Sequence, residues 1–256
     1  MRLFQQSGLL QADEMEIFDS TIDDVDEWLF QEYFKAEFGE TYQKKGLTLE
    51  KALQAKKVMR NGRLTLAGLL FFGREPQTFR PIFTIKTVSF AGNSIGGCNY
   101  RNKPEDVTGT IPGIYKQAMM FLRASLRYLQ NGQGFNSHGV PEVSFIALEE
   151  VVQNALIHRD YFKSSPIRLL IFDNRIEIIS PGTLPNSLTV EEVKYGNPVT
   201  RNHQIAYFAS RTLPYTGLGS GLRRAYENQP DIELVNDTNG EQFIVRIPRP
   251  GQNQPG

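Results

Sequence analysis

Apolar residues recur along this chain at spacings that alternate between helical and extended segments. Where they stand three or four residues apart, one face of the segment is apolar and a helix is predicted. Helices are expected on this ground over Asp23–Phe38, Leu49–Met59, Ile111–Leu129, 189–195, 203–211 and 220–227. The apolar run Leu64–Phe72 fits a helix or a strand, because so short a run carries no decisive period. Residues 1–20 are expected to be extended or linker-like.

Other segments are rich in β-branched and aromatic residues, which favour strands. These segments are Phe83–Phe90, Ile167–Phe172, Arg175–Ile179, 232–236 and 242–247. Asp173 and Asn174 separate two of them and are typical of a tight turn, so those two strands are expected to form a hairpin. Hairpins beside helices predict an α+β fold, in which a mixed sheet carries helices on one face. A doubly wound fold is not favoured, because the regular alternation of strand and helix is missing.

One further helix carries polar residues in a regular row. It is expected to begin at Pro141, since proline suits a first helical turn, and to end near His158. Glu150, Asn154 and His158 stand four residues apart and therefore project along one side of this helix. The other side would face the core with Phe145, Leu148, Val152, Ala155 and Leu156.

The chemistry of this row leaves two interpretations open. The side-chain oxygen of Asn154 is a hard ligand of the kind that Mg²⁺ accepts, and a carboxylate such as Glu150 can orient a water molecule as a general base. With Arg159 and Asp160 directly after it, the row would meet a hard cation and phosphates. Alternatively, the row is the solvated face that an amphipathic helix ordinarily has. Spacing alone does not separate these two interpretations.

A glycine-rich turn near the end of the chain is a second candidate. Gly217, Gly219 and Gly221 stand at alternate positions before a helix, where backbone N–H groups can approach and hold an anion. A plain glycine turn would have the same composition. The turn is not a dinucleotide-binding G-x-G-x-x-G motif, because position 222 is leucine, and the chain contains no G-x-x-x-x-G-K-[ST] phosphate loop.

The composition excludes several classes of protein. Lys and Arg number 28 and so do Asp and Glu, so no net charge attracts the chain to nucleic acid or to a membrane surface. Cys98 is the single cysteine, which excludes an internal disulfide and any site with several cysteine ligands. No apolar run reaches the length of a membrane span, and the first residues lack the apolar region of a signal peptide. A cytoplasmic protein without a membrane partner is therefore expected.

The charges are nevertheless distributed unevenly. Residues 11–40 hold eleven acidic side chains and one basic side chain, whereas residues 41–90 hold ten basic side chains and two acidic ones. Within the basic stretch the closest group is Lys56, Lys57, Arg60 and Arg63. Such a group can neutralise phosphates of DNA. We favour the simpler interpretation that it pairs with the acidic segment that precedes it.

Taken in order, these motifs resemble a known family. The segment from Glu150 to Tyr161 is similar to the N-box of the GHKL ATPase superfamily. More closely, the chain resembles the ATPase-like region of bacterial and archaeal proteins described as transcriptional regulators, often labelled RecG-like or Schlafen/AlbA-associated. The segments that carry this resemblance are 64–73, 154–161, 171–185, 201–206 and 217–221. The resemblance extends over roughly residues 45–225.

The resemblance implies a domain organisation. Residues 81–250 would form a GHKL-like ATPase domain, with the sheet and helix layers of a Bergerat sandwich. Residues 1–80 would form a mainly helical segment before it, and residues 251–256 a disordered tail. Members of the family contact DNA through an AlbA-type domain or a winged helix, and neither is evident in this sequence. DNA is therefore expected as a partner only through domains outside this chain.

The resemblance also implies roles for individual residues. Glu150 would be the water-orienting base and Asn154 the ligand of Mg²⁺ in an ATP complex. The further nucleotide-binding residues would be Asn154, His158, Arg159, Asp160, Gly182, Gly217, Gly219 and Gly221. Gly182 belongs to Ser180-Pro181-Gly182, which stands where the family has its adenine-reading D-x-G-x-G box. The aspartate of that box is missing, since Ile179 or Ser180 occupies its place, and adenine would lose a charged hydrogen-bond acceptor worth roughly 1.5–3 kcal/mol.

Three functions remain open at this stage. The first is a nucleotide-binding, GHKL-like domain of a transcriptional regulator, with weak or no ATPase activity. The second is a degenerate domain that binds no nucleotide and serves as a scaffold for regulation or homodimerisation. The third is a DNA-contacting module that uses the basic group at Lys56–Arg63. Retention of Glu150 and Asn154 favours the first, and the altered segment 179–182 favours the second.

Overall fold

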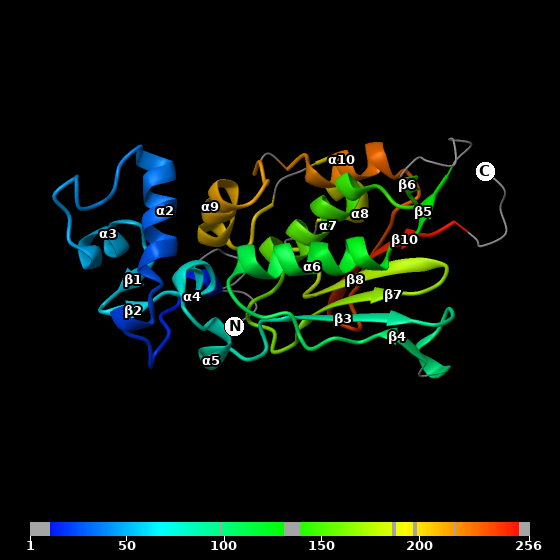
Figure 1. Ribbon diagram of the computed structural model, residues 1–256, viewed down its shortest axis with the longest axis horizontal. Coiled ribbons are helices and arrows are strands. Elements are labelled where there is room, and N and C mark those ends of the chain that lie inside the picture. Colours follow the sequence, from blue (N-terminus) through cyan, green and yellow to red (C-terminus); the bar gives the residue numbers. More distant parts are fainter. Residues whose placement is uncertain are drawn as a thin grey trace.

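The centre of the molecule is a six-stranded mixed sheet (Figure 1). The computed structural model describes residues 11–97, 99–130, 139–185, 188–196, 199–217 and 219–250. The strands follow the order β4 (Tyr100–Asn102), β3 (Ile85–Phe90), β7 (Ile167–Ile171), β8 (Arg175–Pro181), β10 (Gln242–Pro248) and β9 (Glu233–Asp237). β3 and β7 are parallel, and all other neighbours are antiparallel. The hairpin expected at Asp173-Asn174 is confirmed as β7–β8.

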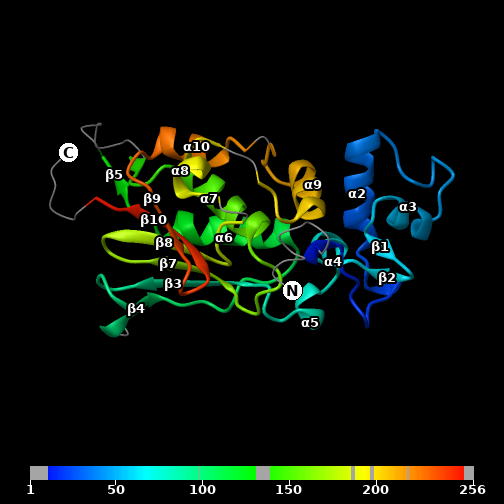
Figure 2. The same ribbon diagram turned by 180° about the vertical axis from the view of Figure 1, so that it is seen from behind.

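Helices cover one face of this sheet, which confirms the α+β fold (Figures 1 and 2). They are α6 (Ile111–Ser125), α7 (Phe145–His158), α8 (Val190–Lys194) and α10 (Gly221–Asn228), with α9 (His203–Thr212) at one end. Side chains alternate across a strand, so Leu169, Ile178 and Val245 point toward these helices and belong to the main core. This face of the sheet also forms the floor of a large pocket beneath the helices.

The opposite face of the sheet carries a small apolar cluster beneath charged side chains. The cluster consists of Phe90, Leu170, Phe172, Ile179 and Ile244. The guanidinium of Arg175 lies 4.0 Å from the ring centre of Phe172, and Glu177 accepts hydrogen bonds from Arg175 and Arg246. The aliphatic parts of these long charged side chains thus cover the apolar cluster on the face of the sheet that carries no helices.

Residues 11–84 form a mainly helical segment at one end of the molecule (Figure 2). Its elements are the 3-10 turns η1 (Ala12–Glu14) and η2 (Ile22–Asp24), the helices α2 (Glu27–Phe38), α3 (Leu49–Ala55), α4 (Leu66–Phe72) and α5 (Pro76–Phe79), and the hairpin β1 (Met59–Arg60) and β2 (Arg63–Leu64). The ring of Phe208 in α9 stands edge-on to Tyr33 and Phe72, with ring centres 5.5 and 5.1 Å apart. A single apolar core therefore continues from this segment into the sheet layer.

Several element limits differ from the expectation. Pro141 does not begin a helix, because it lies in β6 (Val140–Pro141), which pairs with β5 (Tyr128–Leu129). α7 begins instead after Ser144, whose hydroxyl accepts the N–H of Ala147. β5 likewise ends the preceding helix α6 earlier than expected, and β1 does the same for α3. The ambiguous run Leu64–Phe72 is helical from Leu66, with Thr65 as its N-cap.

An extended or linker-like segment was expected over residues 1–20. Residues 1–10 lie outside the described residues, and residues 11–20 do not form a linker. Asp13 is fully buried, and its carboxylate accepts the backbone N–H groups of Gln204 and Ile205 at the start of α9. Burial raises the pKa of Asp13, while these backbone hydrogen bonds act in the opposite direction. At the other end of the chain, the tail expected at 251–256 lies outside the described residues. Arg249 just before it is buried and paired with Glu142.

The basic group at residues 56–63 is largely neutralised by acidic neighbours. Lys56 pairs with Glu37, and both Lys57 and Arg60 pair with Glu14. This arrangement supports the interpretation that these cations pair with the preceding acidic segment. Separately, the helices in the described part of the chain are all too short or too polar to cross a bilayer.

Gly68 in α4 provides a test of this packing. A Cβ atom there would lie 2.1 Å from the carbonyl oxygen of Val58, so Gly68→Ala is expected to destabilise the fold by about 1–3 kcal/mol. Gly113→Ala in α6 is the matched control, because its nearest contact would be 3.5 Å from the Thr110 hydroxyl and alanine favours a helix by up to about 1 kcal/mol. Urea unfolding followed by circular dichroism measures both, and equal stabilities would contradict the proposed close contact.

Candidate functional site

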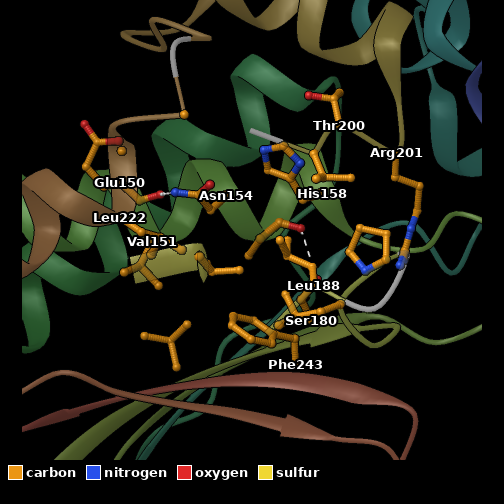
Figure 3. A pocket seen from close by; sticks show the side chains of 18 of the residues that line it. Glu150, Val151, Asn154, His158, Ser180, Leu188, Thr200, Arg201, Leu222 and Phe243 are labelled. Carbon is orange, nitrogen blue, oxygen red and sulfur yellow. Dashed lines mark hydrogen bonds between the residues drawn. The ribbon is translucent and has the colours of Figure 1, made fainter. Parts of the chain in front are cut away.

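A large pocket opens between the helix layer and the sheet (Figure 3). It encloses about 1060 Å³, counting the part that is open to solvent. Its walls come from α7, from β8 and β10, and from the segments 182–185, 199–201 and 215–222. The chain thus brings together at this pocket segments that are up to about one hundred residues apart.

The floor of the pocket is apolar. Ile178 and Phe243, on the neighbouring strands β8 and β10, face it from the sheet, and Val151 and Ala155 face it from α7. Leu222 at the start of α10 closes it from the side. A flat apolar slot of this kind is suited to an aromatic ring system.

The polar row of α7 lies along this pocket. Glu150, Asn154 and His158 all line it, in that order from one end toward the other, so their predicted common orientation is confirmed (Figure 3). The amide nitrogen of Asn154 donates to the carbonyl oxygen of Glu150 at 2.7 Å. This bond fixes the amide so that its oxygen is the atom left to face a ligand.

Glu150 is held tightly by the next helix. Its side chain is buried, and its carboxylate forms an ion pair with Arg224 of α10. Gly221, at the first position of α10, lies so close that a Cβ atom there would be 2.4 Å from a carboxylate oxygen of Glu150 and 3.3 Å from the Asn154 amide nitrogen. A side chain at this position would therefore displace the Glu150 carboxylate from its present place against α10.

The glycine turn runs above the polar row. Gly217, Gly219 and Gly221 all line the pocket, and the first two have φ angles of +70° and +73°, which glycine adopts without strain. Leu218 between them lies outside the described residues. The turn leads directly into α10, so backbone N–H groups of this segment and the start of the helix meet the pocket beside Glu150.

Arg201 stands at the opposite end of the pocket (Figure 3), and Gly182 lies beside it. A Cβ atom at Gly182 would lie 2.6 Å from a terminal nitrogen of Arg201 and 2.4 Å from Cβ of Asp160. Ser180 also faces this part of the pocket, and its hydroxyl donates to the carbonyl oxygen of Ala155 at 3.2 Å. Glu150 and Arg201 therefore mark the two ends of the pocket.

Two expected site residues lie elsewhere. Arg159 does not line the pocket: it is only 2% exposed, and its guanidinium donates to the carbonyl oxygens of Lys163 and Ser165. The expectation that Arg159 opens onto the same cavity as Asn154 is therefore wrong, and the reason is local. Arg159 comes directly after His158, so an advance of about 100° around the helix axis already turns its side chain away from the row. Asp160 lies just outside the lining, 3.8 Å from Arg201.

His158 is in an environment that keeps it neutral. Burial lowers its pKa to about 4, and the positive charge of Arg201 acts in the same direction. The Nε2 atom of His158 lies 3.3 Å from the hydroxyl of Tyr215, a further lining residue. At neutral pH the imidazole can therefore both donate and accept hydrogen bonds at the middle of the pocket.

Three residues that the sequence did not single out complete the site. Arg201 and Tyr215 line the pocket, and Arg224 pairs with the lining residue Glu150 from outside the lining. Arg201 stands beside Asn202, which is fully buried and donates to the carbonyl oxygens of Ile157 and Arg159 at the end of α7. The Arg201-Asn202 pair was visible only as part of the family resemblance. Arg224 belongs to a surface-like helical pattern, and no local signal separates it from its exposed neighbour Arg223.

The donor set is compatible with a Mg²⁺–nucleotide complex. Mg²⁺ takes few protein ligands and obtains the others from phosphates and water, and Asn154 offers one hard oxygen beside the glycine turn. Gly221 brings the start of α10 against the Glu150 carboxylate and the Asn154 amide, where a Cβ atom would lie 2.4 and 3.3 Å from them. In the described residues no group of three or more His, Cys, Asp or Glu side chains could hold a metal by itself. A cation here would thus depend on ligand phosphates.

Comparisons with known proteins support an ATPase-like domain in this chain. Residues 164–247 match the family model "Putative ATP-dependent DNA helicase recG C-terminal", so the chain contains an ATPase-like domain. The match includes Gly182 and the glycine turn but begins after α7. No protein of curated function matches the chain.

A solved structure shares the fold. The crystal structure of the DIP2311 protein from Corynebacterium diphtheriae is similar to this chain with a TM-score of 0.66 at 19% sequence identity. The similarity covers 97% of this chain and 49% of that protein, so this chain spans about half the length of its structural relative. At this identity the comparison supports the fold and not a shared activity.

The environment of His158 predicts a pH dependence of stability. An unfolded histidine takes up its proton near pH 6.5, whereas His158 in the fold does so only near pH 4, so acidification between these values favours the unfolded state. The free energy of unfolding should fall across this window, by at most about 1.4 kcal/mol per pH unit from this group. Below pH 4 its contribution stops changing.

Urea unfolding at pH 7, 6 and 5 measures this effect. His158→Gln, which cannot take up a proton, should show a flatter decline than the wild type, whereas His203→Gln at an exposed position of α9 should not. Parallel pH profiles of wild type and His158→Gln would show that His158 is not held neutral by the fold.

Proposed function

We propose that the pocket binds the Mg²⁺ complex of a nucleotide, with ATP the ligand that the family resemblance implies, and that hydrolysis is weak or absent. The observation that carries this proposal is the meeting of Asn154 with the glycine turn at one end of an apolar slot. That arrangement combines a hard oxygen ligand, backbone N–H donors and a flat apolar floor. A nucleotide needs these three elements in this order.

The phosphates belong at the Glu150 end. Backbone N–H groups of Gly217–Gly221 and the start of α10 provide a positive environment there, and Arg224 adds a cation. Asn154 would hold Mg²⁺ through its amide oxygen. Bound Mg²⁺ would supply further charge neutralisation between the phosphates, because the positive charge of Arg224 is already paired with Glu150.

The base belongs in the apolar part of the pocket. Ala155, Ile178, Phe243 and Val245 form a floor and wall without charged groups, and burial of a ring there removes apolar surface from water. Ser180 and Gly182 stand at the edge where polar atoms of the base would lie. This orientation follows from the position of the phosphates, since only one end of the pocket carries the glycine turn.

Hydrolysis would be slow for two reasons. Glu150, the residue expected to orient water, forms an ion pair with Arg224, and an ion-paired carboxylate is a weaker base than a free one. No carboxylate among the described lining residues stands at the base end, so the ligand is held there without the charged acceptor of the ATPase family. Productive transfer needs the phosphates in a fixed position relative to water.

A second candidate is a scaffold that binds no nucleotide. The Glu150–Arg224 pair favours it, because the two charges satisfy each other without a ligand. In both cases we propose a regulatory role, as in the transcriptional regulators that the sequence resembles. DNA contact by the basic group near Lys56 is disfavoured, since Glu14 and Glu37 already pair with three of its cations.

Nucleotide binding depends on Asn154 if this proposal is correct. We expect Asn154→Ala to weaken binding of a non-hydrolysable ATP analogue with Mg²⁺ by about tenfold or more, since a lost charge-assisted contact costs at least about 1.4 kcal/mol. Isothermal titration calorimetry measures the affinities. Gln54→Ala, which removes an exposed amide from α3, is the control and should bind as the wild type does. Equal binding by Asn154→Ala would exclude Asn154 as a ligand.

The rate of hydrolysis tests the role of Glu150. We expect turnover below about 0.1 s⁻¹, at least a hundredfold under the typical enzyme value of roughly 10 s⁻¹. A phosphate-release assay measures it, with Glu150→Ala giving the background. Fast turnover that disappears in Glu150→Ala would mean that the ion pair with Arg224 opens readily in the bound state.

A further inference from the structure

Arg201 is the one cation at the end of the pocket where the proposed function puts the base, among the described lining residues. Its backbone is fixed by the neighbouring Asn202, which is fully buried and hydrogen-bonded to the end of α7. A terminal nitrogen of its guanidinium lies next to Gly182, at the position where a Cβ atom would come within 2.6 Å. Arg201 is therefore held at the base edge and not on a mobile surface loop.

The guanidinium of Arg201 has N–H groups that are not used in hydrogen bonds within the described part of the protein. Its side chain is only 21% exposed, yet the hydrogen bond to the carbonyl oxygen of Thr183, at 2.6 Å, uses just one N–H group. Asp160 is 3.8 Å away, which is an ion pair but too long for a hydrogen bond, and its other oxygen accepts the N–H of Phe162. A guanidinium has five N–H groups, so several remain for a ligand.

No carboxylate among the described lining residues stands at the same end. The sole lining carboxylate is Glu150, which is at the phosphate end and paired with Arg224. The proton of the Ser180 hydroxyl is used by the carbonyl oxygen of Ala155. A ligand edge that faces the Arg201 guanidinium meets N–H donors and has to present acceptor atoms to them.

Guanine and adenine differ in the hydrogen-bond acceptors that they would present to Arg201. The O6 and N7 atoms of guanine are both acceptors, and a guanidinium binds them together in a bidentate pair. Adenine has N7 as an acceptor but an amino group in place of O6, which would place a donor against a donor. The guanidinium thus favours a 6-oxopurine over adenine, whereas the aspartate of the ATPase family, absent here, favours the reverse.

We propose that Arg201 makes the pocket selective for guanine nucleotides and other 6-oxopurine nucleotides over adenine nucleotides. The inference rests on the proposed function, since it assumes that a nucleotide occupies the pocket with its phosphates at the glycine turn. Asp160 orients the guanidinium from behind and does not itself meet the base, because it lies outside the lining.

Calorimetric titration with Mg²⁺ and the β,γ-imido analogues of GTP and ATP tests the selectivity. We expect the wild type to bind the GTP analogue about tenfold or more tightly than the ATP analogue, as one bidentate contact provides. Arg201→Ala should remove this difference. Arg201→Lys should restore little of it, because an ammonium group cannot bind both acceptors in one plane. Arg223→Ala, an exposed cation on α10, should leave the preference intact.

A second set of calorimetric titrations compares the affinities for GDP, IDP and ADP. Inosine retains O6 and N7 but lacks the 2-amino group of guanine, so IDP should bind like GDP if Arg201 reads those two atoms. Circular dichroism of each variant confirms folding before titration.

The outcomes separate the two proposals. If none of the five nucleotides binds, the proposed function fails. If nucleotides bind but the ATP analogue binds as tightly as the GTP analogue or more so, nucleotide binding stands and the selectivity of Arg201 is wrong. Persistence of the preference in Arg201→Ala, or binding of IDP at the level of ADP, would also overturn it.

Discussion

The close contact between α10 and α7 at Gly221 is the constraint on which the pocket depends. Without a side chain at Gly221, the start of α10 lies directly against Glu150 and Asn154, and Arg224 on the next turn reaches the Glu150 carboxylate. Burial of a charged carboxylate is costly unless a partner neutralises it, so the two helices stabilise this arrangement mutually. The glycine turn before α10 has to follow a fixed path, which gives one wall of the pocket its shape.

The contact between α10 and α7 also affects any ligand that binds at the Glu150 end of the pocket. A phosphate that approaches the glycine turn meets Arg224 together with a carboxylate of opposite sign, so the local field depends on whether the ion pair is closed or open. A ligand can shift such an equilibrium only through its different affinity for the two arrangements. Gly217 and Gly219, with positive φ angles, are the positions at which the backbone could change direction between them.

The sequence predicted those features that depend on local periodicity. The row Glu150, Asn154 and His158 follows from the geometry of one helix, and the β7–β8 hairpin follows from alternation and a turn. The errors arose where a distant partner decides the conformation. Pro141 lies in a strand because β5 pairs with it, and Asp13 is buried because it accepts N–H groups at the start of α9. Arg159 is a different case, since its place directly after His158 turns it away from the row. Arg201 was missed because no local pattern points to the pocket.

These two ends of the pocket therefore have different physical origins. The end proposed to bind phosphates is formed by a helix and a glycine turn, both of which are short-range motifs that a family resemblance detects easily. The end proposed to bind the base depends on Asn202, which ties Arg201 to the end of α7 through two backbone carbonyl groups more than forty residues away. A cation supported in this way can take the place of a missing acidic residue without any change to the fold. Ligand identity can thus differ between proteins whose phosphate-binding elements look the same.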